Sequence, residues 1–229
     1  MTRHQCHIPR NIRPGAGNQG GFMAVSIYRL KPAFIRLLRP LAAFLAKTGA
    51  TANQVTAAAC VLSVLFAGAL MLRPGSAPLW ALLPVWLFLR MALNAIDGVM
   101  AREFGQKSRL GAILNEMGDV TADAALSIPF ALLPGVQIQA VALFVWMALL
   151  TEFAGVLALC VNAPRRYDGP VGKSDRAFVL GVAALAGAGA CAWGWCIGPA
   201  LNTGLYLCSA LMVWTTVNRL RSALAGENA

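Results

Sequence analysis

The sequence predicts an all-α fold: a polytopic membrane protein with six transmembrane helices and an N-terminal interfacial amphipathic helix. Hydrophobic residues make up 58% of the chain and charged residues only 12%, about half of the ~25% typical of soluble domains. Apolar stretches of the ~17–25 residues needed to span a bilayer also recur along the chain. The length of 229 residues fits one helical bundle rather than several domains.

The N-terminal part of the chain divides into two regions. Residues 1–22 are rich in Gly, Pro and Asn without apolar periodicity, which predicts a disordered tail. Residues 23–48 carry apolar side chains at helical spacing with basic residues between them. We expect a juxtamembrane amphipathic helix in the cytoplasmic interface, and a helix packed on a protein partner is the alternative. Residues 49–225 then form the predicted six-helix membrane domain.

Six apolar segments are long enough to cross a membrane. They run Gln54–Leu72, Ala77–Ile96, Leu110–Leu133, Val136–Val161, Ala177–Trp195 and Leu201–Val217. Every lysine and arginine except Arg73 and Arg90 lies before the first span, in the links after the second and fourth, or after the sixth. The positive-inside rule therefore places both termini in the cytoplasm, and we expect an integral protein of a bacterial inner membrane.

The net charge of +10 follows from this membrane topology and from contact with anionic membrane lipids. No nucleic-acid-binding motif accompanies it, so nucleic acid is not an expected partner.

More than half of the acidic residues lie between positions 94 and 123. At the end of the second span, Arg90, Asn94, Asp97 and Ala101 follow spacings of four, three and four residues. This spacing places the four side chains on one face of a helix.

The third span has a matching polar face. Gly111, Asn115, Asp119 and Asp123 repeat every four residues, and Glu116 lies beside them. Two helices joined by a short link run antiparallel as neighbours, so the polar faces of the second and third spans can meet near the cytoplasmic surface.

Carboxylate and amide oxygens from two helices suit a hard divalent cation such as Mg²⁺ or Mn²⁺. A bound metal would offset the cost of placing acids in a membrane, ~2.5–3.5 kcal/mol each on insertion scales. The alternative is an ion-pair network between the helices that involves Arg90 and Arg102. Because Arg90 and Glu152 both lie within spans, an ion pair between these two is a further hypothesis.

The spacing of these residues resembles a known signature. The segment Asn94-x-x-Asp97-Gly98-x-x-Ala101-Arg102, eight further residues, and Gly111-x-x-x-Asn115-x-x-x-Asp119 are similar to the motif of the CDP-alcohol phosphotransferases. That motif reads DxxDGxxAR, eight or nine residues, then GxxxDxxxD. Ser108, three residues before Gly111, is also typical of the family. The chain departs from the motif at Asn94 and Asn115, where the family has aspartate.

The resemblance covers nearly all of the chain after Met23 and implies a membrane enzyme of phospholipid synthesis. Such an enzyme moves a phosphatidyl group from CDP-diacylglycerol or another CDP-alcohol to the hydroxyl of an acceptor alcohol and releases CMP. A homodimer is also implied.

The resemblance further implies roles for individual residues. One or two Mg²⁺ or Mn²⁺ ions would be held by Asn94, Asp97, Asn115 and Asp119. Asp119 would act as the catalytic base, with Glu116 and Asp123 as reserve candidates. Residues expected to contact the nucleotide or its phosphates are Gly98, Ala101, Arg102, Ser108 and Gly111.

A second polar segment links the fourth and fifth spans. We expect its cations Arg165, Arg166 and Lys173 to bind the diphosphate or a phosphate on the acceptor. The alternative is that these cations only set the membrane topology.

Other functions remain to be weighed against this one. A membrane phosphatase with a histidine nucleophile is excluded, because no histidine follows His7. An ion-coupled transporter fits less well, since the acids gather near one membrane edge and no inverted repeat is visible. A catalytically silent homologue acting as a membrane scaffold is kept open by the two asparagines.

Overall fold

The computed structural model describes residues 25–225, with side chains described from residue 34 onward. The predicted tail, residues 1–22, lies outside this range. The helices are α1 (Val25–Lys47), α2 (Ala52–Leu72), α3 (Ala77–Glu103), α4 (Arg109–Ser127), the 3₁₀ helix η1 (Ile128–Leu132), α5 (Ile138–Leu157), the 3₁₀ helix η2 (Ala158–Val161), α6 (Lys173–Trp193) and α7 (Gly198–Ala225). No strand occurs in the described part of the chain, so the predicted all-α class is confirmed.

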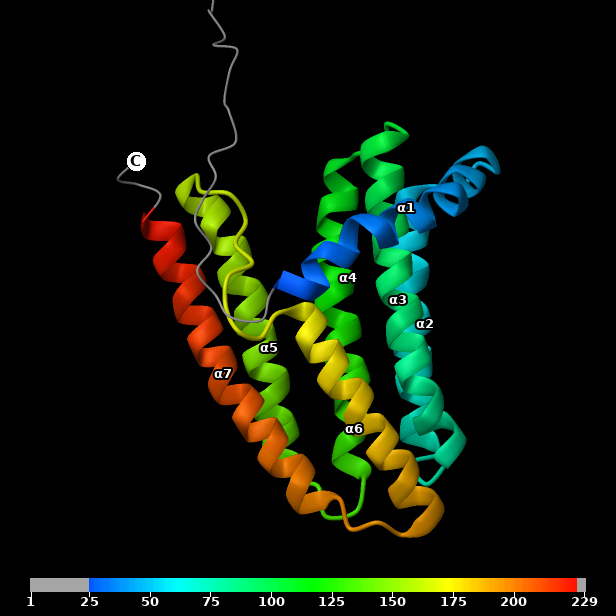
Figure 1. The fold of residues 1–229 in the computed structure, drawn as a ribbon, viewed down its shortest axis with the longest axis vertical. Coiled ribbons are helices and arrows are strands. Elements are labelled where there is room, and N and C mark those ends of the chain that lie inside the picture. Colours follow the sequence, from blue (N-terminus) through cyan, green and yellow to red (C-terminus); the bar gives the residue numbers. More distant parts are fainter. Residues whose placement is uncertain (1–24, 226–229) are drawn as a thin grey trace, which may run out of the picture.

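Helices α2 to α7 alternate in direction along one bundle (Figure 1). The neighbouring pairs are α2 with α3 and α4, α3 with α6, α4 with α5, and α5 with α7. The α3–α4 link and the C-terminal end of α7 lie at the upper end in Figure 1, and the α2–α3, η1–α5 and α6–α7 links lie at the lower end. Basic links and the C-terminal end therefore share one end of the bundle, as the cation distribution predicts.

Five of the described helices are long and apolar enough to cross a membrane: α2, α3, α5 together with η2, α6 and α7. The third predicted span, Leu110–Leu133, is formed by α4 and η1. It runs in contact with α2 and α5 but is not one of the five, because α4 carries Arg109, Glu116, Asp119 and Asp123. The polytopic architecture is confirmed. Five of the six predicted spans are apolar helices long enough to cross a membrane, and the remaining one contains the charged helix α4.

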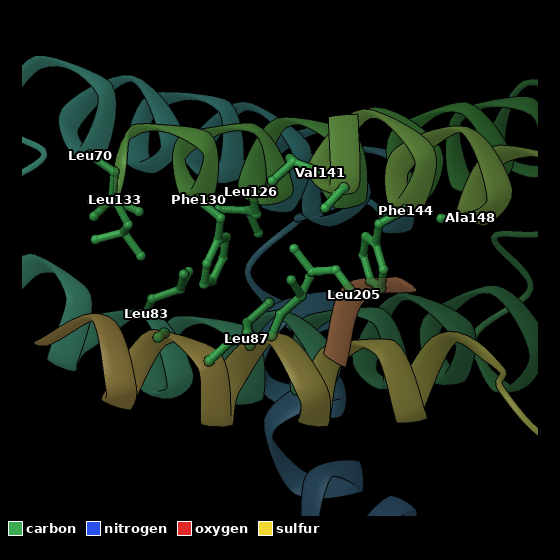
Figure 2. Packing of buried hydrophobic residues seen from close by; sticks show 14 of the residues in the cluster. Leu70, Leu83, Leu87, Leu126, Phe130, Leu133, Val141, Phe144, Ala148 and Leu205 are labelled. Atoms are coloured by element: carbon green, nitrogen blue, oxygen red, sulfur yellow. The ribbon is translucent and has the colours of Figure 1, made fainter. Parts of the chain in front are cut away.

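The main apolar core lies between α2, α3, the end of α4, η1, α5, α6 and α7. Figure 2 shows its leucines and phenylalanines, including Leu83, Leu126 and Phe144, pointing toward one another. Trp80 and Phe130 meet edge to face with ring centroids 4.9 Å apart. Large apolar side chains such as Leu65, Phe88 and Trp214 point outward and are mostly exposed, as expected of helices that face lipid rather than water.

Helix α1 covers the predicted juxtamembrane segment and packs on α3. Ala42 is fully buried in a small cluster with Ile96, Val99 and Met100 of α3. The opposite face of α1 exposes Leu37 and Phe44. This two-sided pattern matches a helix that rests on the bundle with one face and presents apolar side chains outward with the other.

Candidate active site

The start of α2 and the α3–α4 link are tied together by polar contacts. Thr51 caps α2, and its side chain accepts a hydrogen bond from the backbone N–H of Gln54 at 3.2 Å. Gln106 in the link accepts a hydrogen bond from the backbone N–H of Ala52 at 2.6 Å. Ser108 caps α4 and accepts a hydrogen bond from the backbone N–H of Gly111 at 2.9 Å. These caps fix the residues at which α2 and α4 begin.

Two motif glycines make room for side chains at this end of the bundle. A β-carbon at Gly111 would lie 2.6 Å from the Asn53 Oδ1 atom, so glycine here leaves room for the Asn53 side chain between α2 and α4. A β-carbon at Gly98 would lie 3.1 Å from the Arg102 Nη1 atom. The guanidinium of Arg102, an exposed residue, therefore lies directly over Gly98. Ala101, the remaining small motif residue, is half-buried beside it.

The two halves of the motif meet across α3 and α4. Asn94 donates a hydrogen bond from Nδ2 to the Asp119 Oδ1 atom at 2.7 Å. Asp97, one turn later on α3, accepts a hydrogen bond from the Thr56 hydroxyl of α2 at 2.6 Å and lies within electrostatic range of Asp119. Asn115 lies one turn before Asp119 on α4 and is half-buried. The helical spacing therefore predicted correctly that Asn94 and Asp119 face each other, whereas Asp97 makes its hydrogen bond to α2.

Cations also converge on Asp119. The Lys173 ammonium of α6 forms an ion pair with the Asp119 Oδ2 atom. Arg90 donates to the Asp119 backbone carbonyl at 3.0 Å and lies 3.3 Å from the Oδ1 atom. Arg90 also forms an ion pair with Asp123, one turn further along α4. The expected base is thus surrounded by positive charge from α3 and α6.

A buried network continues from Asp123 towards α5 and α6. The Nη2 atom of Arg176 lies 3.1 Å from Asp123 Oδ2 and 2.8 Å from Glu152 Oε1. Arg219 of α7 lies 3.8 Å from the same Glu152 oxygen. The hypothesis of a pair between Arg90 and Glu152 is wrong, because α4 stands between them and Asp123 takes the guanidinium of Arg90.

The three cations expected to bind phosphate separate in the structure. Arg165 pairs with Glu116 at 2.7 Å and with Glu152 at 3.0 Å, and Lys173 pairs with Asp119. Arg166 instead donates to the backbone carbonyl of Ser222 in α7. Only Arg165 and Lys173 therefore reach the acidic cluster.

Arg165 keeps its charge in this environment. Burial alone lowers the pKa of its guanidinium, but the hydrogen bond with Tyr167 and the charges of Glu116 and Glu152 outweigh burial and raise the pKa above its ordinary value. The hydrogen bond from Arg165 to the Tyr167 hydroxyl measures 2.8 Å. Arg165 is thus a fixed, charged contact between the link and α4.

Close backbone contacts hold this α5–α6 link in place. Gly169 has a φ of +125°, and a β-carbon there would lie 2.7 Å from the Thr215 Cα atom of α7. A β-carbon at Gly155 of α5 would lie 2.7 Å from the Arg166 carbonyl oxygen. Both glycines are needed because the link lies directly on helix backbone at these points.

The oxygen-rich part of the site can be tested against a divalent metal. Among residues 25–225, no group of three or more His, Cys, Asp and Glu side chains is placed to hold a metal ion. The candidate set instead combines Asp97 and Asp119 with two amides, and Asn94 turns its nitrogen to Asp119 so that its oxygen is left to coordinate. Hard oxygen donors fit Mg²⁺ or Mn²⁺, so the chemistry of the set fits, with two carboxylates rather than four.

Several residues around the site escaped the sequence reasoning. Thr56 contacts Asp97, and nothing in its sequence context marks it. Thr151 accepts a hydrogen bond from Arg176 at 3.1 Å, while its backbone carbonyl accepts one from Arg219. Only the charged residues within apolar spans could have indicated these contacts, because such a residue needs a partner. The sequence does not reveal which partner that is.

Fold and site together define a membrane-embedded phosphotransferase, with acids and amides of two adjacent helices facing cations of a third helix and a link. The family model for CDP-alcohol phosphatidyltransferase matches residues 50–219. The chain belongs to this family, and the predicted enzyme class, a transferase of substituted phosphate groups, is confirmed.

Individual relatives agree with this placement. Inner membrane protein YnbA of Escherichia coli is 46% identical over 201 residues, which cover 87% of this chain and 97% of that protein. Phosphatidylinositol phosphate synthase of Streptomyces avermitilis is 38% identical over 99 residues, 43% of this chain and 39% of that protein. The second match thus spans less than half of either chain.

Solved structures share the fold. Phosphatidylinositol phosphate synthase of Mycobacterium tuberculosis, crystallised with CDP-DAG bound, superposes with a TM-score of 0.66 at 22% identity. The match covers 82% of this chain and 94% of that one. A crystal structure of the same synthase in complex with manganese and citrate gives a TM-score of 0.65.

Proposed function

We propose that the protein transfers a phosphatidyl group from a CDP-alcohol, namely CDP-diacylglycerol, to the hydroxyl of an acceptor alcohol in phospholipid synthesis. The observation that carries this proposal is the 2.7 Å hydrogen bond from Asn94 to Asp119, which joins the two halves of the motif. Membership of the CDP-alcohol phosphatidyltransferase family supports it. So does the shared fold with a synthase crystallised with CDP-DAG.

In this reaction the acceptor oxygen forms a bond with the phosphorus atom that carries the diacylglycerol. The bond from that phosphorus to the bridging oxygen breaks, CMP leaves with the bridging oxygen, and the acceptor's proton passes to a carboxylate. We assign this role to Asp119, because it is the motif carboxylate that meets Asn94 between α3 and α4. Asp123 lies one turn further along α4, between Arg90 and Arg176. A positioned general base contributes about 10²–10⁴-fold to the rate.

The metal set proposed for Mg²⁺ or Mn²⁺ is Asp97, Asp119 and the side-chain oxygens of Asn94 and Asn115. A divalent ion there would neutralise the diphosphate charge, which is the main requirement of phosphoryl transfer. Because two family aspartates are asparagines here, the set carries less negative charge and should bind the ion more weakly.

Other motif residues would position the nucleotide diphosphate. The Arg102 guanidinium lies over Gly98 at the exposed edge of the site, where its planar donors suit phosphate oxygens. Ala101 leaves space beside it. Ser108 caps the start of α4, and Gly111 lets this first turn lie against Asn53 of α2. Together they fix the position of α4 along the bundle.

We place the protein in a bacterial inner membrane with both termini and the active site on the cytoplasmic side. The shared end of the basic links and the name of the E. coli relative support this. Acyl chains of the substrate would then stay in lipid while the nucleotide reaches water. The homodimer implied by the family resemblance is kept as part of the proposal.

The test is CMP release by purified protein with CDP-diacylglycerol, Mg²⁺ or Mn²⁺, and a panel of alcohols. Asp119→Asn is expected to lower CMP release at least about a hundredfold. Asp168→Asn, the same change in the α5–α6 link, is the matched control and should keep the activity. Full activity in Asp119→Asn would refute the assignment of the base.

A catalytically silent scaffold is the second candidate, favoured by Asn94 and Asn115. It predicts no CMP release with any acceptor, both in the natural chain and in the variant with Asn94→Asp and Asn115→Asp. CMP release by the natural chain would exclude it.

A further inference from the structure

The acidic and basic side chains between α3, α4, α5, α6 and α7 form a closed set, here called the compensated cluster. Its ion-paired acids are Glu116, Asp119, Asp123 and Glu152, and its cations are Arg90, Arg165, Lys173, Arg176 and Arg219. The cations therefore exceed these acids by one, and Asp97, which accepts a hydrogen bond from Thr56, lies at the edge of the cluster. Nearly all of the positive charge is thus matched within the protein.

Glu152 lies among three arginines of the compensated cluster. Arg165 contacts its Oε2 atom at 3.0 Å, and Arg176 contacts its Oε1 atom at 2.8 Å. Arg219 lies 3.8 Å from Oε1. The Glu152 side chain is 8% exposed, so water does little to weaken these contacts. One carboxylate thus lies where three guanidinium groups could otherwise hold a phosphate.

The terminal nitrogens of these arginines are already committed. Arg176 uses Nη1 for Thr151 and Nη2 for Asp123 and Glu152. Arg165 uses Nη1 for Tyr167 and Nη2 for Glu116 and Glu152. Within the described part of the chain, the Nε atoms of Arg165 and Arg176 are buried without a hydrogen-bond partner. Each arginine keeps its Nε–H and one Nη1–H for a hydroxyl oxygen. A two-point grip on phosphate also needs an Nη2–H, and the acids occupy Nη2 in both arginines.

The compensated cluster includes the proposed base, Asp119. Lys173 and Arg90 contact Asp119, and Arg165 contacts Glu116 on the preceding turn of α4. An acceptor whose hydroxyl reaches Asp119 therefore lies against these side chains.

We propose that the acceptor is an alcohol that carries no phosphate group, and that Glu152 and Glu116 are the residues that set this specificity. This inference rests on the proposed phosphatidyl transfer. A phosphorylated acceptor would bring its negative charge beside Glu116 and Glu152 without a free cation to receive it. Like charges placed side by side disfavour the wrong ligand, so discrimination of at least about tenfold is expected.

The experiment has two arms, and the first compares acceptors. CMP release is measured with CDP-diacylglycerol and Mg²⁺, using glycerol, inositol or serine against glycerol 3-phosphate and inositol phosphate at equal concentration. An unphosphorylated alcohol should be the best acceptor, at least about tenfold better than a phosphorylated one. A higher rate with either phosphorylated acceptor overturns the inference.

Variants sharpen this arm. Glu116→Gln frees Arg165 at the more exposed side of the compensated cluster, where the Glu116 side chain is 31% exposed. Its preference should move towards phosphorylated acceptors, while Glu103→Gln, which frees Arg39 outside the cluster, should leave the preference unchanged. An identical preference in Glu116→Gln and the natural chain overturns the specificity role.

The second arm measures binding without catalysis, metal or CDP-diacylglycerol. Inorganic phosphate or glycerol 3-phosphate at millimolar concentration should not raise the thermal midpoint of the natural chain. It should raise that of Glu116→Gln, and of Glu152→Gln if this more buried variant folds. Stabilisation of the natural chain to the same extent as Glu116→Gln overturns the charge argument. Absence of CMP release from every acceptor refutes the proposed function instead, and the binding arm still decides whether the cluster excludes phosphate.

Discussion

The motif region around Asn94, Asp97 and Asp119 and the buried network around Glu152 and Arg176 both gather charged side chains in an apolar chain. They differ in how their charges are balanced. The motif region carries amides where family members carry aspartates, and its edge residue Arg102 is exposed. Its two carboxylates also differ from each other, because Asp119 pairs with Arg90 and Lys173 while Asp97 accepts a hydrogen bond from Thr56. In the buried network Arg176 and Arg219 are each only 2% exposed, and Asp123 and Glu152 each meet two or more guanidinium groups.

This difference in charge balance distinguishes a ligand-binding site from a network that stabilises the fold. A site that receives a metal and a diphosphate needs charge that is left open for them. A structural network instead needs each charge matched within the protein, because an unpaired charge in a low-dielectric interior is costly. The same contrast predicts which substitutions will unfold the protein and which will only stop its reaction.

The largest expected effect is on stability, from Arg176→Met. This change leaves Glu152 and Asp123 buried with one cation fewer, which costs about 3–5 kcal/mol of unfolding free energy. Denaturation of the purified protein in detergent measures the loss. The double variant with Glu152→Gln should lose less than the sum of the two single variants, and strict additivity would contradict the pairing.

On the motif side, Asp97→Asn should leave stability almost unchanged but lower CMP release about a hundredfold or more. Loss of an outer-shell partner already costs 10–100-fold in metal affinity or activity, and a direct ligand should cost at least as much. Thr56→Val, which removes only the 2.6 Å hydrogen bond to Asp97, should lower CMP release about tenfold. Equal losses in the two variants would mean that Asp97 does not act as a ligand.

The two regions also differ in how far the sequence revealed them. Spacings of three and four residues placed Asn94, Asp97 and Asp119 on facing helices, because helical period and antiparallel neighbours are local properties. Hydropathy also located the spans, although α3 and α7 continue to Glu103 and Ala225, beyond the predicted ends at Ile96 and Val217.

The partners within the buried network could not be predicted. The cost of a buried charge predicts that Arg90 has a partner but does not identify Asp123, which lies between Arg90 and Arg176 in the structure. Partner choice depends on helix rotation and on close approaches such as that of Gly155 to Arg166. A single sequence does not display these features.

A smaller effect is expected from Asn94→Asp, which restores the aspartate of the family motif. In the absence of metal, the new carboxylate would face Asp119 in place of a hydrogen-bond donor now 2.7 Å away. The unfolding free energy should fall by on the order of 1 kcal/mol, equivalent to a change of one pKa unit. Mg²⁺ should then stabilise the variant more than the natural chain, as measured by thermal midpoints with and without the ion. An unchanged response to Mg²⁺ would exclude residue 94 from the metal set.

The smallest effect is expected from Arg39→Ala, which removes the 2.8 Å ion pair between α1 and Glu103 of α3. Both side chains are solvent-exposed, at 57% and 36%, so water and salt already screen the attraction. The thermal midpoint should stay within the error of its measurement, and added salt should remove any difference from the natural chain. A loss like that of Arg176→Met would contradict the comparison, because it would mean that pairing rather than burial determines what an ion pair contributes in this protein.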